Sequence, residues 1–170
     1  MPIPDAEAVY RELLARIRLM HEQRPLLVVG IHSGGAWLAQ RLADDLAGSH
    51  CEAGGDSLGF LSSAFHRDDY AQRPGLPDNM NATRLPLSID DREILLVDDV
   101  LYTGRTIRAA LNELFDYGRP GRVQLAVLAD RGGRQLPIQA DFVGCRYEPA
   151  ADQRLTLSRD TDGRFHFQIP

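Results

Sequence analysis

The segment from residue 94 to residue 118 limits the possible folds more than any other part of the chain. Residues 94–98 (ILLVD) are a short apolar run of the kind found in a strand that is buried on both faces. A loop containing Gly104 follows, and residues 105–117 have the apolar periodicity of a helix that Gly118 would end. A strand, a loop and a helix in this order form one βα unit, which predicts an α/β fold.

The same alternation continues along the rest of the chain. Helices are expected over residues 6–23 and 36–47, and strands over residues 26–31, 57–66, 123–128 and 141–144. The tail, residues 154–170, has the pattern of a β-hairpin. Because helical crossovers make neighbouring strands parallel and cover both faces of a sheet, we expect a doubly wound parallel sheet. We expect a single domain over residues 1–170.

A long polar stretch, about residues 67–87, interrupts this pattern and is rich in Pro, Gly and Asn. A stretch of this length without secondary structure inside a compact domain is typical of a functional lid. A dispensable surface loop has the same composition, so the residues alone leave both interpretations open.

The composition excludes several classes of function. All 19 basic residues are arginine, which excludes lysine-dependent chemistry such as a Schiff base or the GK[ST] phosphate loop. The net charge of −5 argues against a general nucleic-acid coat protein but is compatible with a local arginine patch. The two cysteines form no CxxC motif, which argues against a disulfide framework or a zinc site. With no apolar run long enough for a membrane span and no signal-peptide pattern, we expect a cytoplasmic protein.

The acids and the loop after residue 97 predict the chemistry of a site. Asp98 and Asp99 lie at the carboxyl end of a strand, where open α/β sheets bind ligands, and they suit sugar hydroxyls or a hydrated Mg²⁺. Residues 103–106 (TGRT) open a helix whose free N–H groups attract a phosphate. Together these residues predict a site for a phosphorylated ribose. Receiver domains also pair acids at a strand end, but they need a lysine, which this chain lacks.

Residues 94–106, ILLVDDVLYTGRT, resemble the phosphoribosyl pyrophosphate (PRPP) signature of type I phosphoribosyltransferases. The continuation, IRAALNELFDYGRPGRVQLAVLADRGGRQLPIQADFVG, resembles the PyrR family of pyrimidine operon regulators. The resemblance implies the type I phosphoribosyltransferase fold, with a flexible loop and a hood. It also implies a regulator that senses UMP and PRPP and converts uracil and PRPP to UMP and diphosphate with Mg²⁺.

The resemblance implies roles for individual residues. Catalytic roles fall on Asp98, Asp99 and Arg105, and Mg²⁺ would bind through PRPP with the two acids as candidate ligands. The residues that would bind PRPP or UMP are Asp98, Asp99, Val100, Leu101, Tyr102, Thr103, Gly104, Arg105 and Thr106. The pyrophosphate loop is His32, Ser33, Gly34 and Gly35, and the uracil contacts are Ala129, Asp130, Arg131 and Leu155. The flexible loop begins with Arg67, Asp68 and Asp69.

The same resemblance implies a homodimer or higher oligomer that binds the leader of a pyrimidine-gene mRNA. The candidate RNA-binding residues are Arg11, Arg16, Arg18, His21, Arg24 and Arg134. Arginines on a solvated helix face, paired with Glu12 and Glu22, would give the same sequence pattern, so this alternative stays open.

Three positions depart from the family pattern. Gly34 stands where the family has an arginine, Ser62 where it has an aspartate, and Gly133 where it has a histidine. These departures favour a second hypothesis, a nucleotide-sensing RNA-binding regulator with little or no catalysis. A third hypothesis is a phosphoribosyltransferase for another base. If the missing cation limits catalysis, Gly34→Arg should raise the rate.

Overall fold

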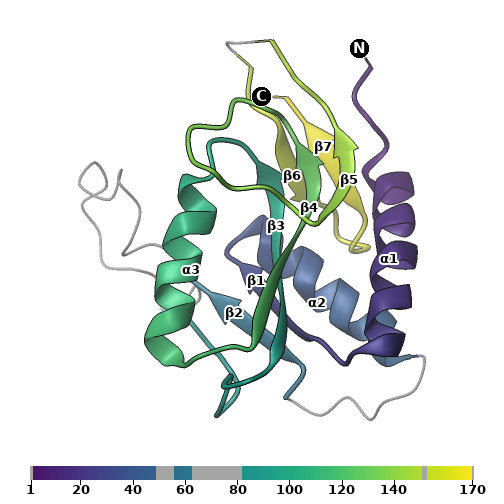
Figure 1. Cartoon of the computed structure of the whole chain (residues 1–170). Helices are drawn as coiled ribbons and strands as arrows, with labels where there is room; N and C mark the ends of the chain where they lie inside the picture. The colour runs from purple at the N-terminus through teal and green to yellow at the C-terminus, as the bar shows by residue number, and fades with distance from the viewer. Residues whose placement is uncertain (1, 49–55, 63–81, 151–152, 170) are drawn as a thin grey trace.

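The computed structural model describes residues 2–48, 56–62, 82–150 and 153–169. A five-stranded sheet with the strand order β2-β1-β3-β4-β5 forms its centre (Figure 1). The strands are β1 (Leu27–Ile31), β2 (Leu58–Leu61), β3 (Glu93–Leu101), β4 (Arg122–Asp130) and β5 (Phe142–Arg146). Every neighbouring pair in this sheet is parallel, as the alternation of strands and helices predicted.

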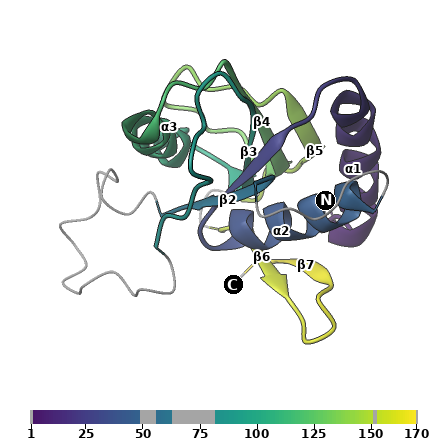
Figure 2. The ribbon, with the colours of Figure 1, turned by 90° about the horizontal axis from the view of Figure 1, so that it is seen from below.

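Helices cover both faces of the sheet, so the expected double winding is confirmed (Figures 1 and 2). Helices α1 (Ala6–Gln23) and α2 (Gly34–Ala47) pack on one face, and α3 (Arg105–Tyr117) packs on the other. The core is accordingly divided into two apolar clusters, one on each side of the sheet. Asp5 caps α1, since its carboxylate accepts hydrogen bonds from the backbone N–H groups of Glu7 and Ala8.

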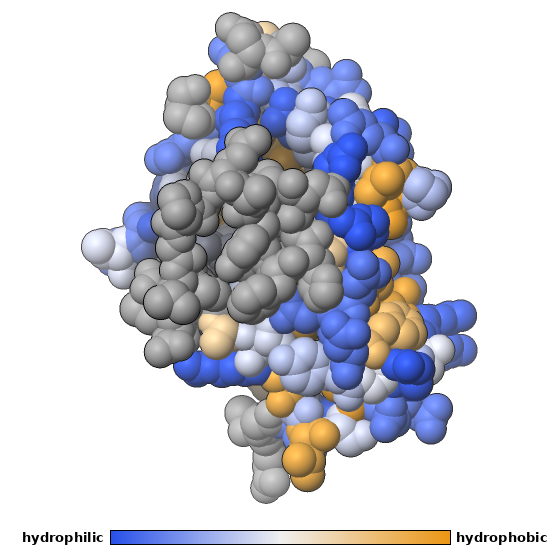
Figure 3. Space-filling model, turned by 90° about the vertical axis from the view of Figure 1, so that its left-hand side faces the viewer, coloured by the Kyte–Doolittle hydropathy of each residue, from blue (hydrophilic) through white to orange (hydrophobic). Residues whose placement is uncertain are grey.

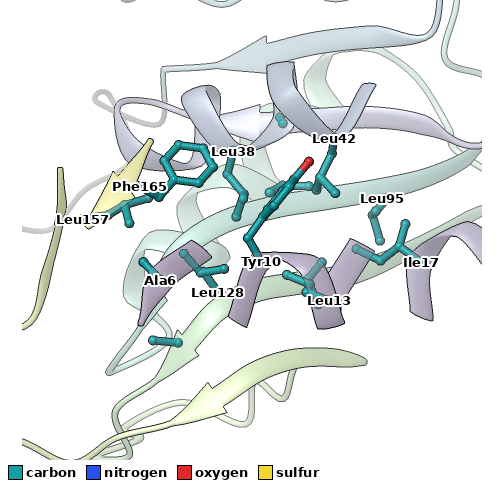
Figure 4. Packing of buried hydrophobic residues seen from close by; sticks show 14 of the residues in the cluster. Ala6, Tyr10, Leu13, Ile17, Leu38, Leu42, Leu95, Leu128, Leu157 and Phe165 are labelled. Carbon is teal, nitrogen blue, oxygen red and sulfur yellow. The ribbon is translucent and has the colours of Figure 1, made fainter. Parts of the chain in front are cut away.

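The C-terminal hairpin is also confirmed. It consists of β6 (Thr156–Arg159) and β7 (Phe165–Gln168), which pair antiparallel and lie on the side of α1 and α2. Leu157, Phe165 and Phe167 are buried in the same cluster as the apolar faces of these two helices (Figure 4). The hairpin is therefore part of the core on that side and not a free appendage.

All five strands of the sheet differ from their expected bounds by at least one residue, and the largest differences are in β3 and β2. The sequence predicts that the strand before the loop containing Gly104 ends at Asp98, but β3 continues to Leu101. The reason is tertiary, because Val100 and Leu101 pair with Ala129 and Asp130 of β4. Strand β2 ends at Leu61, and residues 63–66 of the expected strand lie outside the described residues.

The polar stretch at 67–87 falls mostly outside the described residues. Its described end returns to the sheet, where Arg84 forms an antiparallel bridge with Phe60. Ser62 and Thr83 stand on either side of the undescribed part, and the backbone N–H of Ser62 donates to Thr83 Oγ1 at 3.0 Å. The two ends of the segment are therefore held together.

Figure 3 shows the side of the molecule that carries α3, whose visible surface is mainly polar with scattered apolar side chains. Among the described residues, no helix combines the length and the apolar character that crossing a membrane requires.

Candidate active site

A cavity of about 660 Å³ opens where the carboxyl ends of β1 and β3 meet the start of β6. This volume is within the range of small-molecule sites in proteins. The cavity brings together segments that are far apart in the sequence. Its lining residues are His32, Ser33, Gly34, Trp37, Asp98, Asp99, Val100, Leu101, Tyr102, Thr103, Gly104, Arg105, Thr106, Ile107, Arg131, Arg154, Leu155, Thr156 and Leu157.

The paired acids are held by their own backbone. Asp98 Oδ1 accepts a hydrogen bond from the N–H of Asp99 at 3.0 Å, and Asp99 Oδ1 accepts one from the N–H of Val100 at 2.9 Å. Asp98 is 7% exposed, whereas Asp99 is half-buried. These bonds orient both carboxylates at the end of β3, so the acids are preorganised for a ligand that donates hydrogen bonds.

Two helices begin at the cavity. Helix α3 follows Gly104, which adopts a left-handed backbone with φ of 90°, and helix α2 follows Ser33. Ser33 supplies no side-chain cap to α2, whereas Thr103 Oγ1 accepts a hydrogen bond from the first N–H of α3, that of Arg105, at 3.3 Å. The first N–H groups and the positive ends of both helix dipoles thus face one space, which favours a ligand with two separate anionic groups.

The start of α2 packs directly against the acids. A Cβ on Gly35 would lie 2.5 Å from the carbonyl oxygen of Val97, and a Cβ on Gly34 would lie 2.3 Å from Asp99 Oδ2. Only glycine fits at these two positions with the acids as they stand. From the sequence, we interpreted Gly34 as the loss of a cation. In the structure, the Asp99 carboxylate already occupies the space that a side chain at this position would need.

The segment after β4 supports the phosphate loop. The N–H groups of Gln135 and Leu136 donate to the carbonyl oxygen of Thr103 at 3.0 and 3.2 Å, and Arg134 donates to the carbonyl oxygen of Tyr102. The Arg131 guanidinium lies 4.0 Å from the centroid of the Tyr102 ring, a cation–π contact. Arg131 Nε is buried and has no hydrogen-bond partner within the described part of the chain.

The four residues expected to contact uracil fall into two groups. Arg131 and Leu155 line the cavity, whereas Ala129 is fully buried in β4 and Asp130 is turned toward Arg134, with 2.6 Å between Asp130 Oδ2 and Arg134 Nη2. Burial raises the pKa of Asp130, but hydrogen bonds from Arg134 and from the N–H of Gly132 outweigh it and lower the pKa overall. Asp130 is therefore ionised and stabilises the loop at residues 131–134 through these bonds.

His32 lines the cavity just before α2, and its ring centroid is 5.6 Å from that of Phe60. Burial lowers the pKa of His32, and the nearby charge of Arg84 lowers it further. The imidazole is therefore neutral near pH 7 until an anion approaches it.

The sequence did not predict the cavity wall that Trp37 and the start of the hairpin form, with the exception of Leu155. Trp37 comes from α2, and Arg154, Thr156 and Leu157 come from the start of the hairpin. The alternation in 154–170 predicted the hairpin, but no local pattern indicates that it folds back over the loops of β1 and β3. Gly35, by contrast, was expected to be a site residue, but it supports the loop and does not line the cavity.

The expected RNA-binding residues mostly make contacts within the chain. Arg11 donates to the carbonyl oxygen of Glu7, Arg16 to that of Val143 and Arg18 to that of Asp45. Arg24 pairs with Glu93, the ring of His21 accepts from the N–H of Leu26, and Arg134 lies apart from them in the phosphate-loop support. Arg11, Arg16 and Arg24 stay exposed. Arg67, Asp68 and Asp69, expected to begin the flexible loop, lie outside the described residues.

Within the described ranges, no group of three or more His, Cys, Asp or Glu side chains is arranged to hold a metal ion. Asp98 and Asp99 are two carboxylates beside a space for phosphates. Mg²⁺ is commonly held by one or two carboxylates together with substrate phosphates and water, so the pair fits an ion that arrives with its substrate.

The phosphoribosyl transferase domain model matches residues 2–154 of the chain. The bifunctional protein PyrR of Ralstonia nicotianae is 52% identical over 169 residues, covering 96% of this chain and 92% of that protein. The bifunctional protein PyrR of Nitrosococcus oceani is 44% identical, covering 95% and 90%. A hypoxanthine phosphoribosyltransferase from Staphylococcus aureus shares the fold, with a TM-score of 0.60 and 23% identity over 85% of this chain and 73% of that chain.

Proposed function

The chain belongs to the PyrR family of phosphoribosyltransferases, and we propose how its cavity binds PRPP and transfers the phosphoribosyl group to uracil. As a member, it is a regulator of pyrimidine genes with uracil phosphoribosyltransferase activity. The observation that carries the proposal is the meeting of two helix N-termini with one pair of carboxylates. PRPP has matching chemistry, with a phosphate at one end, a diphosphate at the other and ribose hydroxyls between them.

Each part of PRPP has a proposed place. The N-terminus of α3, with Thr103, Gly104 and Thr106, binds the 5′-phosphate. Asp98 and Asp99 accept hydrogen bonds from the ribose hydroxyls. The diphosphate lies at the N-terminus of α2, beside His32 and Ser33.

The reaction needs no side-chain nucleophile. As the bond between C1′ and the diphosphate breaks, positive charge develops on the ribose ring, N1 of uracil forms the new bond to C1′, and the proton on N1 leaves to solvent. Asp98 and Asp99 lie close enough to the ribose site to stabilise that charge, while the α2 N-terminus stabilises the departing anion. Mg²⁺, held by PRPP and these acids, would supply charge neutralisation of the diphosphate.

Uracil is proposed to lie between Arg131 and the start of the hairpin. The Arg131 guanidinium lines the cavity and can donate to a uracil carbonyl oxygen, and Leu155 is an apolar surface for the ring. This placement makes Tyr102, stacked under Arg131, a support for the base as well as a part of the phosphate loop.

RNA binding is proposed for the exposed arginines of the α1 side. Arg11, Arg16 and Arg24 keep surface-exposed guanidinium groups that can reach phosphates, whereas Arg18 is half-buried against α2. We propose that a homodimer presents these groups twice, so that the two sets contact one RNA.

The first experiment measures formation of UMP and diphosphate from labelled uracil, PRPP and Mg²⁺. The variant Asp98→Asn/Asp99→Asn is expected to lose turnover and PRPP binding, because an amide is a weaker acceptor than a carboxylate. Asp162→Asn, in the exposed hairpin turn, is the control and should match the wild type. Unchanged turnover in the double variant would reject the assigned acids. Wild-type protein that binds UMP without turnover would favour a sensor, as Gly34 suggests.

A further inference from the structure

Glu7 joins α1, α2 and β7, although its own side chain does not line the cavity. Its two carboxylate oxygens accept from Arg41 Nη1 at 2.6 Å and Nη2 at 2.9 Å, a bidentate ion pair between α1 and α2. Glu7 Oε1 also accepts from the backbone N–H of Phe165 at 2.8 Å. One side chain of α1 thus holds α2 and the first residue of β7 at once.

Two aromatic rings pack against the arginine of this ion pair. The Arg41 guanidinium lies 4.2 Å from the centroid of the Tyr10 ring and 5.0 Å from that of Phe165, and the two rings meet edge to face at 5.6 Å. Figure 4 shows Tyr10 and Phe165 projecting toward Leu38 and Leu42 of α2. The side chains of Glu7 and Arg41 are 20% and 32% exposed, so the pair is shielded more than a surface pair.

The hairpin connects these contacts of Glu7 to the cavity. Phe165 pairs with Arg159, and Leu157 pairs with Phe167, so the position of β7 determines the position of β6. The residues at the start of β6, Leu155 to Leu157, line the cavity. A hydrogen bond at Phe165 therefore fixes where the base-binding wall lies.

Packing alone does not fix the hairpin against α2. A second cavity of about 330 Å³ lies between them, lined by Trp37, Arg41, Arg159 and Phe165 among others. Apolar burial holds the hairpin to the core but is not directional, whereas the bonds of Glu7 have defined geometry. The hydrogen bond from the Phe165 N–H to Glu7, together with the cation–π contact of Arg159 with Trp37, therefore gives the hairpin a defined orientation over this space.

Helix α2 also reaches the diphosphate side of the cavity. Arg41 lies about two turns along α2 from Gly34, at 3.6 residues per turn. The ion pair is therefore distant from the first turn of α2, and diphosphate binding should not depend on it.

We propose that Glu7 and Arg41 are positioning residues for the base, holding the hairpin where Leu155 and Leu157 contact the pyrimidine ring. This inference rests on the proposed function, because it takes the hairpin side of the cavity as the base site. Neither residue lines the cavity, so their effect passes through β7 and β6.

The test uses Glu7→Gln in the full chain. The amide keeps the size of the side chain but loses the bidentate ion pair that orients the oxygen accepting from the Phe165 N–H, so KM for uracil should rise about tenfold, while KM for PRPP and kcat change little. Tyr10→Phe is the matched control, because it removes the 2.5 Å bond from Tyr10 Oη to Asp45 Oδ2 in the same junction and leaves Glu7 paired. It should keep the wild-type KM for uracil.

Binding and fluorescence separate this inference from the proposed function. In calorimetry, Glu7→Gln should weaken UMP and leave diphosphate unchanged. Trp37, the single tryptophan, lies 5.3 Å from the Arg159 guanidinium and should become more accessible to iodide quenching in Glu7→Gln only. Equal loss for both ligands, or identical behaviour of the two variants, would overturn the positioning role. Wild-type protein that binds neither UMP nor diphosphate would overturn the proposed function and this inference with it.

Discussion

The Asp99 carboxylate occupies the space in which a side chain on Gly34 would begin, since a Cβ placed there would lie 2.3 Å from Asp99 Oδ2. The diphosphate loop and the acid pair are therefore in direct contact. A change at one of these residues must move the other, so the site cannot regain the family's arginine by simple addition.

Gly34→Ala and Gly34→Arg separate the two effects. Alanine forces Asp99 off its present rotamer, which costs about 1 kcal/mol, so kcat/KM for PRPP should fall several-fold. Arginine causes the same displacement but adds a cation beside the diphosphate, so it should be more active than alanine and less active than the wild type. Steady-state kinetics of the three proteins checks this order. An arginine variant faster than the wild type would show that the missing cation outweighs the contact with Asp99.

Gly133 is expected to control the stack of Tyr102 on Arg131. Gly133 has φ of 66°, and a Cβ on it would lie 2.4 Å from Tyr102 Cε2. Gly133→Ala should therefore cost about 1–2 kcal/mol from backbone strain and also weaken UMP binding by displacing the ring. Urea unfolding and calorimetry measure the two effects.

The control for this prediction is Gly163→Ala in the hairpin turn. Gly163 has a similar φ of 81°, but a Cβ there would meet nothing within 4 Å. It should show the strain without the loss of UMP affinity. If both variants bind UMP like the wild type, Tyr102 has no part in the base site.

The difference between what the sequence predicted and what it missed has a physical cause. Residues 94–106 act within one βα unit, so apolar periodicity and loop chemistry were enough to predict Asp98, Asp99 and the phosphate loop. Leu157 and Trp37 reach the cavity only through the return of the hairpin, which is a contact between distant parts of the chain. Ala129 was expected to touch uracil, but it lies within a strand that is buried on both sides.

His32 should take up a proton when diphosphate binds. Burial and Arg84 hold its pKa below 6.5 in the free protein, and an anion at the loop would favour the charged imidazole. Calorimetry near pH 6.5, in two buffers of different ionisation enthalpy, should show net proton uptake in the wild type and less in His32→Gln. Equal uptake by the two proteins would assign the proton to another group.

The lowered pKa of His32 also predicts a stability profile. The unfolded chain binds this proton near pH 6.5, and the folded chain binds it only at lower pH. The free energy of unfolding is therefore not reduced by His32 above pH 6.5 and falls as the pH drops through that value. His32→Gln should flatten this part of the profile in urea unfolding.

Glu7 should contribute to stability in a lower pH range. The hydrogen bonds from Arg41 hold its pKa below 4.5, although burial opposes them. The contribution of the ion pair is therefore full above pH 4.5 and is lost as the pH falls through the lower, folded-state value. Free energies of unfolding measured between pH 6 and pH 3 should fall more steeply for the wild type than for Glu7→Gln. Parallel profiles would show that the pair does not stabilise the ionised carboxylate.

Salt dependence tests which arginines contact RNA. Each phosphate contact that is lost lowers the slope of log affinity against log salt by about 1. Arg11→Gln, Arg16→Gln and Arg24→Gln should each reduce the slope for a pyrimidine-leader RNA, because these side chains are exposed. Arg18→Gln is the comparison, since this side chain is half-buried against α2, and the substitution should leave the slope unchanged. Uniform slopes across all four variants would place the RNA on another face of the molecule.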